Sequence, residues 1–288
     1  MQQDSLHRFL IENTDVRGER VHLDQTWQQL LACADYPAPV KKVLGEALAA
    51  ALLLSATLKY NGSLSLQING AGAVNLLLIQ ASSAGTVRGL ARWKHIPQGD
   101  SLPDIFGEGH LVITIEPNDG GERYQGIVDL QEDSLTDALA VYFEQSEQLK
   151  TRLWLAVDDN SAAGILLQRL PNDDSDDEGW NRSVSLAETL SSDELLSLDA
   201  ETVLYRLFHE EQLRLFDAES IKFQCTCSQE KIEGMVASLG QQEAENMLKE
   251  HDEIAIDCEF CNQHYQLDGI DIKRIFAENM ANVSKTIH

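Results

Sequence analysis

The chain has 288 residues, 43% of them hydrophobic and 24% charged, and it carries a net charge of −25. This length and composition are typical of a globular protein with about two domains and a core that needs no disulfides. The negative charge excludes the common mode of nucleic-acid binding, which needs a basic surface, and it disfavours anionic membrane surfaces.

The N-terminus and the apolar runs give no sign of export. The first residues lack a basic region followed by an apolar core, which a secretory signal requires. The most apolar run, residues 47–56, is about half as long as a membrane-spanning helix. We therefore expect a cytoplasmic protein with neither nucleic acid nor a membrane as a partner.

Residues 1–172 predict one α+β domain with a mostly antiparallel sheet and packed helices. Helices are predicted around Leu6, Phe9 and Leu10, around Trp27, Leu30 and Leu31, over 40–58, and over 135–147 after an N-cap at Ser134. Apolar runs bounded by turn residues predict strands at 63–69, 74–80, 86–93, 111–115, 124–130, 153–157 and 162–170. Because no nucleotide-binding motif or catalytic constellation is recognisable, we expect that the protein is not an enzyme.

A shift in charge marks the predicted end of this domain. Residues 1–172 hold 21 acidic and 13 basic side chains, a net of −8, whereas residues 173–288 hold 26 and 9, a net of −17. Five acidic side chains fall within 172–179, and their mutual repulsion disfavours packing. This stretch is therefore predicted to be a boundary.

Residues 173–220 predict an acidic, helical linker of low stability. Ser191 and Glu194 have the spacing of a capping box, and Asp199 is placed to cap a second short helix. Isolated helices of this length are marginal in water, so they need a surface on which to pack. Two interpretations stay open: a permanently packed connector, or a metastable segment whose apolar face is sometimes uncovered.

Four cysteines in the last quarter of the chain form two close pairs, Cys225-Thr226-Cys227 and Cys258-Glu259-Phe260-Cys261. Two such pairs on separate turns are typical of a tetrahedral metal site, so we predict that the four thiolates bind one Zn²⁺. Buried structural thiols and fixed disulfides are the alternatives. His251 and His264 are possible alternative ligands, and the isolated Cys33 is predicted to be a buried, inert thiol.

Residues 221–288 predict a small domain around this site, with helices over 229–239 and 242–250, a hairpin from 254 to 267, and a final helix. About sixty residues with few large apolar side chains do not fold on burial alone, so a metal would supply on the order of 10 kcal/mol. Oxidation of the thiolates to disulfides would remove the ligands and unfold the domain. Of the three possible pairings, loop-closure entropy favours Cys225–Cys227 and Cys258–Cys261.

Several stretches resemble the redox-regulated chaperones of the thirty-three-kilodalton heat-shock family. The resemblance is carried by the CTC and CEFC motifs with the NQHYQL that follows, by LHRFL near the start, by GERYQG at 121–126, by SEQLKTRLWL at 146–155 and by RLFHEE at 206–211. It extends over essentially the full length, and all four cysteine positions match.

This resemblance implies a holdase that needs no ATP and is inactive when it is reduced and zinc-bound. Oxidants such as peroxide with heat, or hypochlorous acid, would form the two adjacent disulfides, release zinc and unfold the linker. The protein would then bind unfolded client proteins through apolar surface and form a homodimer. From their apolar spacing, the candidate client contacts in the linker are Leu195, Leu196, Val203, Leu204, Leu207 and Phe208.

Two other functions stay open from the residues alone. A zinc-knuckle module that binds another macromolecule would favour basic residues near the knuckles, whereas acidic residues outnumber Lys222 and Lys231 there. A thiol–disulfide oxidoreductase acting through Cys258 and Cys261 would place this motif at a helix N-terminus, which lowers a thiol pKa. Here the pattern predicts a position between two strands.

Overall fold

The computed structural model describes residues 4–58, 61–171 and 177–285, and in the last helix it describes side chains only as far as residue 277. Contacts within the chain divide it into two compact units, residues 1–224 and 225–288. The segment 173–220 falls within the first unit, and the three-part division of the chain stays a prediction. Residues 172–176 of the predicted acidic boundary lie outside the described residues.

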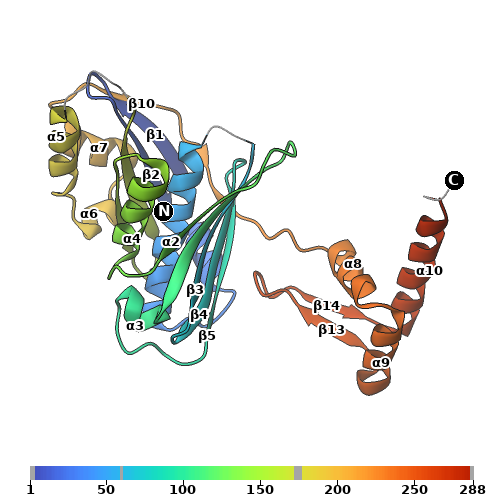
Figure 1. The fold of residues 1–288 in the computed structure, drawn as a ribbon. Coiled ribbons are helices and arrows are strands. Elements are labelled where there is room, and N and C mark those ends of the chain that lie inside the picture. Colours follow the sequence, from blue (N-terminus) through green and yellow to red (C-terminus); the bar gives the residue numbers. More distant parts are fainter. Residues whose placement is uncertain (1–3, 59–60, 172–176, 286–288) are drawn as a thin grey trace. The chain divides into compact units, whose positions relative to one another are not determined.

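Two six-stranded sheets form the described framework of the first unit (Figure 1). The first sheet has the order β10-β1-β2-β9-β8, with β11 also paired to β1, and comprises β1 (Ser5–Ile11), β2 (Val16–Leu23), β8 (Thr151–Val157), β9 (Ala162–Arg169), β10 (Leu213–Leu215) and β11 (Glu219–Ser220). The second has the order β12-β5-β4-β3-β6-β7 and comprises β3 (Gly62–Gly70), β4 (Val74–Ser82), β5 (Thr86–Trp93), β6 (Gly109–Pro117), β7 (Tyr124–Asp129) and β12 (Lys222–Phe223). Only the short β12–β5 pairing is parallel among the described strands. The predicted α+β fold with antiparallel sheets is confirmed.

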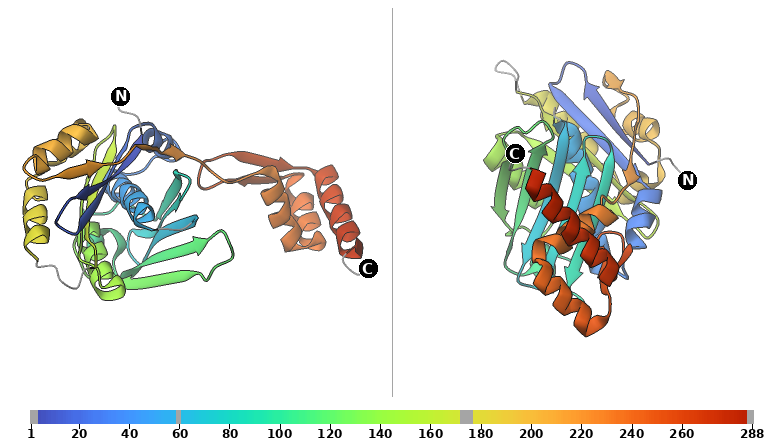
Figure 2. Two further views of the ribbon diagram at one scale, coloured as in Figure 1. Left: turned by 90° about the horizontal axis from the view of Figure 1, so that it is seen from above. Right: turned by 90° about the vertical axis from the view of Figure 1, so that its right-hand side faces the viewer.

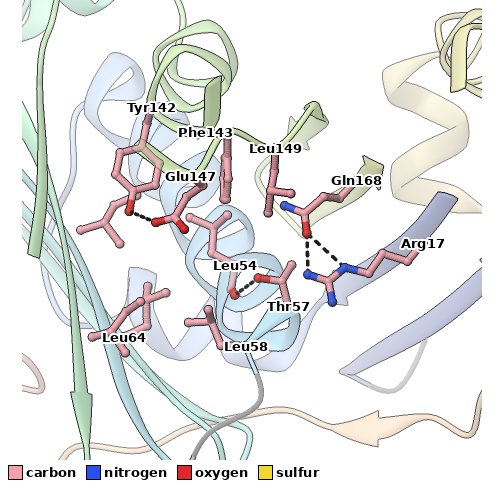
Figure 3. Close-up of a pocket in the computed structure, with 12 residues that line it drawn as sticks. Arg17, Leu54, Thr57, Leu58, Leu64, Tyr142, Phe143, Glu147, Leu149 and Gln168 are labelled. Carbon is pink, nitrogen blue, oxygen red and sulfur yellow. Dashed lines mark hydrogen bonds between the residues drawn. The ribbon is translucent and has the colours of Figure 1, made fainter. Parts of the chain in front are cut away.

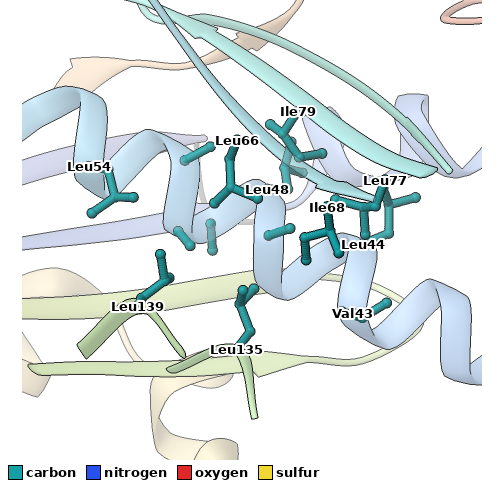
Figure 4. Packing of buried hydrophobic residues seen from close by; sticks show 14 of the residues in the cluster. Val43, Leu44, Leu48, Leu54, Leu66, Ile68, Leu77, Ile79, Leu135 and Leu139 are labelled. Carbon is teal, nitrogen blue, oxygen red and sulfur yellow. The ribbon is translucent and has the colours of Figure 1, made fainter. Parts of the chain in front are cut away.

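The long helix α2 (Ala38–Thr57) lies between the two sheets and contacts strands of both (Figure 1 and Figure 2). Fourteen of its twenty residues are buried, because Ala and Leu occupy all of its faces. Leu44, Leu48 and Leu54 point into a core that they share with β3, β4 and the helix α4 (Leu135–Tyr142) (Figure 4). The prediction of a helix buried on most sides is confirmed.

The first unit also contains shorter helical segments. They are α1 (Gln25–Leu31), α3 (Leu102–Phe106) and a π-helical turn, η1 (Phe143–Glu147), that continues α4. The hydroxyl of Ser134 accepts a hydrogen bond from the backbone N–H of Asp137, so the predicted N-cap of α4 is confirmed.

Three helices cover the other face of the first sheet: α5 (Glu178–Ala187), α6 (Ser192–Ser197) and α7 (Ala200–Phe208). Both predicted caps are confirmed, since Ser191 and Glu194 form a capping box and Asp199 accepts a hydrogen bond from the backbone N–H of Thr202. Beneath α7, the Phe9 ring lies over Gly18, where an added Cβ would be only 2.1 Å from the ring. The first sheet is therefore packed on both faces.

The predicted helix around Leu6, Phe9 and Leu10 is wrong, because this segment is strand β1. Leu6 packs on the α2 side of the sheet, whereas Phe9 packs on the side of α5–α7. A strand that is buried on both faces loses the alternation of apolar and polar residues that marks most strands. The neighbouring strand β2 was missed because charged side chains interrupt its apolar residues.

The second unit contains α8 (Gln229–Leu239), α9 (Gln241–His251), the hairpin of β13 (Ile254–Asp257) and β14 (His264–Leu267), and α10 (Gly269–Lys285). All five elements were predicted with similar bounds. Their described core consists of seven buried side chains: Ile232, Val236, Ala244, Ile254, Leu267, Ile272 and Ile275.

None of the helices in the described residues is both long enough and apolar enough to cross a bilayer.

Candidate metal centre

The four clustered cysteines of the second unit bring their sulfur atoms within 4.8 Å of one another. The Sγ atoms of Cys225 and Cys258 are 3.6 Å apart, and those of Cys227 and Cys261 are 3.4 Å apart. A tetrahedral zinc with bonds of about 2.3 Å would need sulfur–sulfur distances of about 3.8 Å. The four cysteines can therefore hold one metal ion with small adjustments.

The local structure explains how each pair is presented. Cys225 and Cys227 lie just before α8, which begins at the N-cap Ser228, and the Nζ of Lys231 donates to the carbonyl of Thr226 between them. The Cys258–Cys261 turn connects β13 to β14. It is closed by hydrogen bonds from the backbone N–H of Cys258 to Gln263 and from that of Asn262 to Cys258. Asn262 has a φ of 56°, a left-handed conformation that Asn tolerates well.

Electrostatics make this cluster unfavourable as four thiolates without a cation. Burial raises the pKa of both Cys258 and Cys261, and the neighbouring thiols of Cys225, Cys227 and Cys258 raise the pKa of Cys261 further. Hydrogen bonding to Cys227 also raises the pKa of the Tyr265 hydroxyl to about 12. A divalent cation among the sulfurs would offset this repulsion and favour the thiolate forms.

The other candidate ligands lie elsewhere. His264 directs its Nδ1 toward the carboxylate of Asp257 at 2.6 Å, and His251 lies 4.0 Å from Glu250. Neither belongs to the ligand group found among the described residues. Cys33 is buried in the first unit, where its Sγ contacts the carbonyl of Gln29 at 3.3 Å, in agreement with the prediction of a buried thiol.

The six candidate client contacts lie on α6 and α7, facing the first sheet. Five of them are at most 3% exposed, namely Leu195, Val203, Leu204, Leu207 and Phe208, while Leu196 is partly buried. The rings of Phe208 and Phe9 pack with centroids 6.1 Å apart. In this structure the apolar stripe is thus covered by strands β1, β2 and β9.

The sequence analysis missed charged side chains that are buried in the same layer. Arg20 and His22 on β2 are 1% and 2% exposed, and the guanidinium of Arg20 donates to the carbonyl of Leu198, just after α6. Charged residues at alternate positions of a short segment were the available signal. Because buried charges are rare, this signal alone does not indicate a buried cluster.

A small pocket of about 70 Å³ lies at the C-terminal end of α2 (Figure 3). Its polar lining groups bind one another: Arg17 donates to Gln168, and the hydroxyl of Tyr142 donates to Glu147 at 3.1 Å. Apolar side chains such as Leu54, Leu58 and Leu64 form most of the rest. This arrangement offers no nucleophile paired with a base, so it does not add a catalytic site.

The chain is similar to known proteins over nearly its whole length. A family model described as Hsp33 protein matches residues 4–268. A 33 kDa chaperonin of Nitrosococcus oceani is 48% identical over 288 residues, covering 99% of each chain. A 33 kDa chaperonin of Shewanella baltica is 43% identical over 286 residues, covering 99% of this chain and 100% of the relative.

The fold is similar to a solved structure as well. The crystal structure of a 33 kDa chaperonin from Thermotoga maritima superposes with a TM-score of 0.85, covering 97% of this chain and 100% of the other. The two sequences are 22% identical, so this match concerns the fold.

Proposed function

The chain belongs to the Hsp33 family of chaperones, and we propose that it is an ATP-independent holdase that oxidation switches on. In the reduced state one Zn²⁺ would be held by Cys225, Cys227, Cys258 and Cys261. The observation that carries the proposal is the cluster of four cysteine sulfurs within 4.8 Å of one another. As a chaperone, the protein would bind unfolded or partly folded client proteins.

Bound zinc would keep the four sulfurs as thiolates and would cross-link the two turns that carry them. Among the side chains that the structure describes, the core of this unit consists of only seven buried residues. Metal coordination in a unit of this size supplies on the order of 10 kcal/mol of folding free energy. Loss of the ligands would therefore unfold residues 225–288.

Oxidation removes the ligands by joining sulfurs in pairs. Each disulfide forms from two thiolates, and the two electrons reduce one peroxide molecule, which takes up two protons and leaves as water. We propose that Cys225 pairs with Cys227 and Cys258 with Cys261, because these pairs close the shortest loops. Such pairing leaves the two turns unlinked, so the unit would stay open.

The surface that would bind clients is the apolar layer between the first sheet and α5–α7. This layer contains Phe9, Ile165, Leu204 and Phe208 among its buried side chains. We propose that residues 173–220 form the metastable linker, whose helices leave the sheet on activation. The apolar side chains of α6 and α7 and the sheet face beneath them would then both be available to apolar client segments.

We also propose an oligomeric state and a cellular location for the active protein. The oxidised protein would form a homodimer, and it would act in the cytoplasm without nucleic acid or a membrane as partner. The net charge of −25 supports this choice of partners.

The test uses one preparation assayed twice for suppression of client aggregation. Reduced, zinc-loaded protein should be nearly inert toward a thermally unfolded enzyme, and protein treated with peroxide at elevated temperature should be active without ATP. Zinc release and peptide mapping of the disulfides are measured on the same samples. Equal activity in the two states would refute the redox switch.

Two variants separate the metal site from general effects of cysteine loss. Replacing both Cys258 and Cys261 by serine should abolish tight zinc binding, whereas Cys33→Ser should leave it unchanged. Retained zinc in the double variant would refute the ligand assignment. Insulin reduction by the metal-free wild type would instead favour an oxidoreductase.

A further inference from the structure

Three side chains form a polar cluster beneath α6 and α7, and we call His7, Arg20 and His22 the Arg20 cluster. His7 on β1 is paired in register with Arg20 on β2. His22 lies two residues beyond Arg20 on the same strand, so both point to the same face of the sheet. The guanidinium of Arg20 identifies this face, because it contacts the carbonyls of Leu195 and Leu198.

Two of the three side chains in the cluster are shielded from solvent. Arg20 is 1% exposed and His22 is 2% exposed, while His7 is half-buried. The Nδ1 atoms of both histidines and the Nε of Arg20 are buried without a hydrogen-bond partner among the described residues. The buried guanidinium of Arg20 therefore lies next to two imidazole rings, and no acceptor among the described residues stabilises a proton on the Nδ1 atom of either ring.

The surrounding charges come from the start of α7 and from the residues that flank β1 and β2. Asp199 at the start of α7 attracts Arg20, and Glu201 on α7 attracts His7. The Nε2 of His22 is 2.9 Å from the carboxylate of Asp24, and Asp4 lies near enough to attract it. His7 also shares a hydrogen bond with the backbone of Phe216, after β10.

Burial and then Arg20 lower the pKa of both histidines, despite these acidic neighbours. The docked state therefore favours neutral imidazoles, whereas the undocked state lets both take up protons near pH 6.5. A group whose folded pKa is lowered contributes stability above its unfolded pKa and loses it as the pH falls. Protonation of the two histidines therefore favours the undocked state as the pH falls below 6.5.

We propose that the Arg20 cluster is an acid-sensitive contact that releases α6 and α7 from the first sheet when His7 and His22 become protonated. Mild acid would then uncover the apolar face without oxidation of the cysteines. This inference rests on the proposed function in one respect, namely that the uncovered apolar face is the surface that binds clients.

The test measures hydrogen–deuterium exchange by mass spectrometry on the reduced, zinc-loaded full-length protein at pH 7.5 and 5.5. Exchange times are scaled for the intrinsic pH dependence of the chemistry, and peptides of α2 serve as the internal reference. Below pH 6.5, the open population of α6 and α7 should rise by up to tenfold per pH unit for each histidine. At least a tenfold rise relative to α2 is expected in the wild type.

The variant is His7→Gln combined with His22→Gln, and its matched control is His95→Gln combined with His110→Gln, two exposed histidines of the same unit. The first variant should show less than a twofold change between the two pH values, and the control should behave as the wild type. The ratio between pH values is the readout, so a general loss of stability in the variant does not mimic the result. In Arg20→Met the response should shrink but persist, because burial of the histidines remains.

Zinc content is measured on every sample, since acid also protonates thiolates. If zinc loss drove the opening, the His7/His22 variant would open as much as the wild type, and that outcome overturns the proposal. An absent acid response in the wild type overturns it as well. Exchange is read without oxidant or client, so failure of the redox switch leaves this test intact.

Discussion

Replacing Phe208 by alanine should release α7 from the first sheet while leaving the core around α2 in place. The Phe208 ring is 1% exposed and packs on Phe9 in the layer beneath α5–α7. It does not belong to the buried cluster that surrounds α2. Truncation of a buried Phe costs about 3–5 kcal/mol, because apolar burial is lost and a cavity remains.

Because about 1.4 kcal/mol corresponds to a factor of ten, the open population of α7 should rise by at least about a hundredfold. We expect faster amide exchange over residues 200–208 with little change over 38–57. If the covered face is the client surface, the reduced, zinc-loaded variant should also suppress client aggregation without peroxide.

The matched control is Tyr205→Ala, on the same helix but 74% exposed. This substitution removes a ring of similar size without opening the apolar layer. The amide exchange of α7 and the suppression of client aggregation should therefore equal those of the wild type. Unchanged protection of α7 in Phe208→Ala would refute the packing argument. Equal loss of protection in α2 would show that the two layers unfold as one.

Three further predictions concern the metal, a cap and a buried acid. Removal of zinc by a chelator under reducing conditions should abolish the far-ultraviolet circular dichroism of α8–α10, because the core of that unit is small; unchanged helicity would show that the metal is dispensable for folding. Asp199→Ala should cost about 1 kcal/mol of α7 docking, seen as roughly a fivefold rise in its exchange. Burial raises the pKa of Glu19 to about 7, so the contribution of Glu19 to the stability of the first unit should be lost as the pH rises from 4.5 through 7. Glu19→Gln should remove that slope in urea titrations and add on the order of 3 kcal/mol at pH 8, whereas an unchanged slope would exclude Glu19 as its source.

Local signals in the sequence were sufficient for the elements that depend on neighbouring residues. The caps at Ser134, Ser191 and Asp199 were predicted because a side-chain oxygen and a backbone N–H three residues later are all that they require. The four cysteines were also recognised from spacing, since each pair of a metal site lies on one short turn. The hairpin that carries the second pair, and the helices around it, followed from the same local reasoning.

Tertiary structure decided what depends on residues far apart in the chain. β1 is a strand because it pairs with β2, and both of its faces are covered by segments whose positions its own sequence does not encode. Arg20 is buried because the carbonyl of Leu198, 178 positions later, comes to accept its hydrogen bond. The sequence by itself determined the metal-binding motif and the helix caps, because these are short-range. Only the packing of the linker helices on the sheet determined which apolar face is covered and which charges lie beneath it.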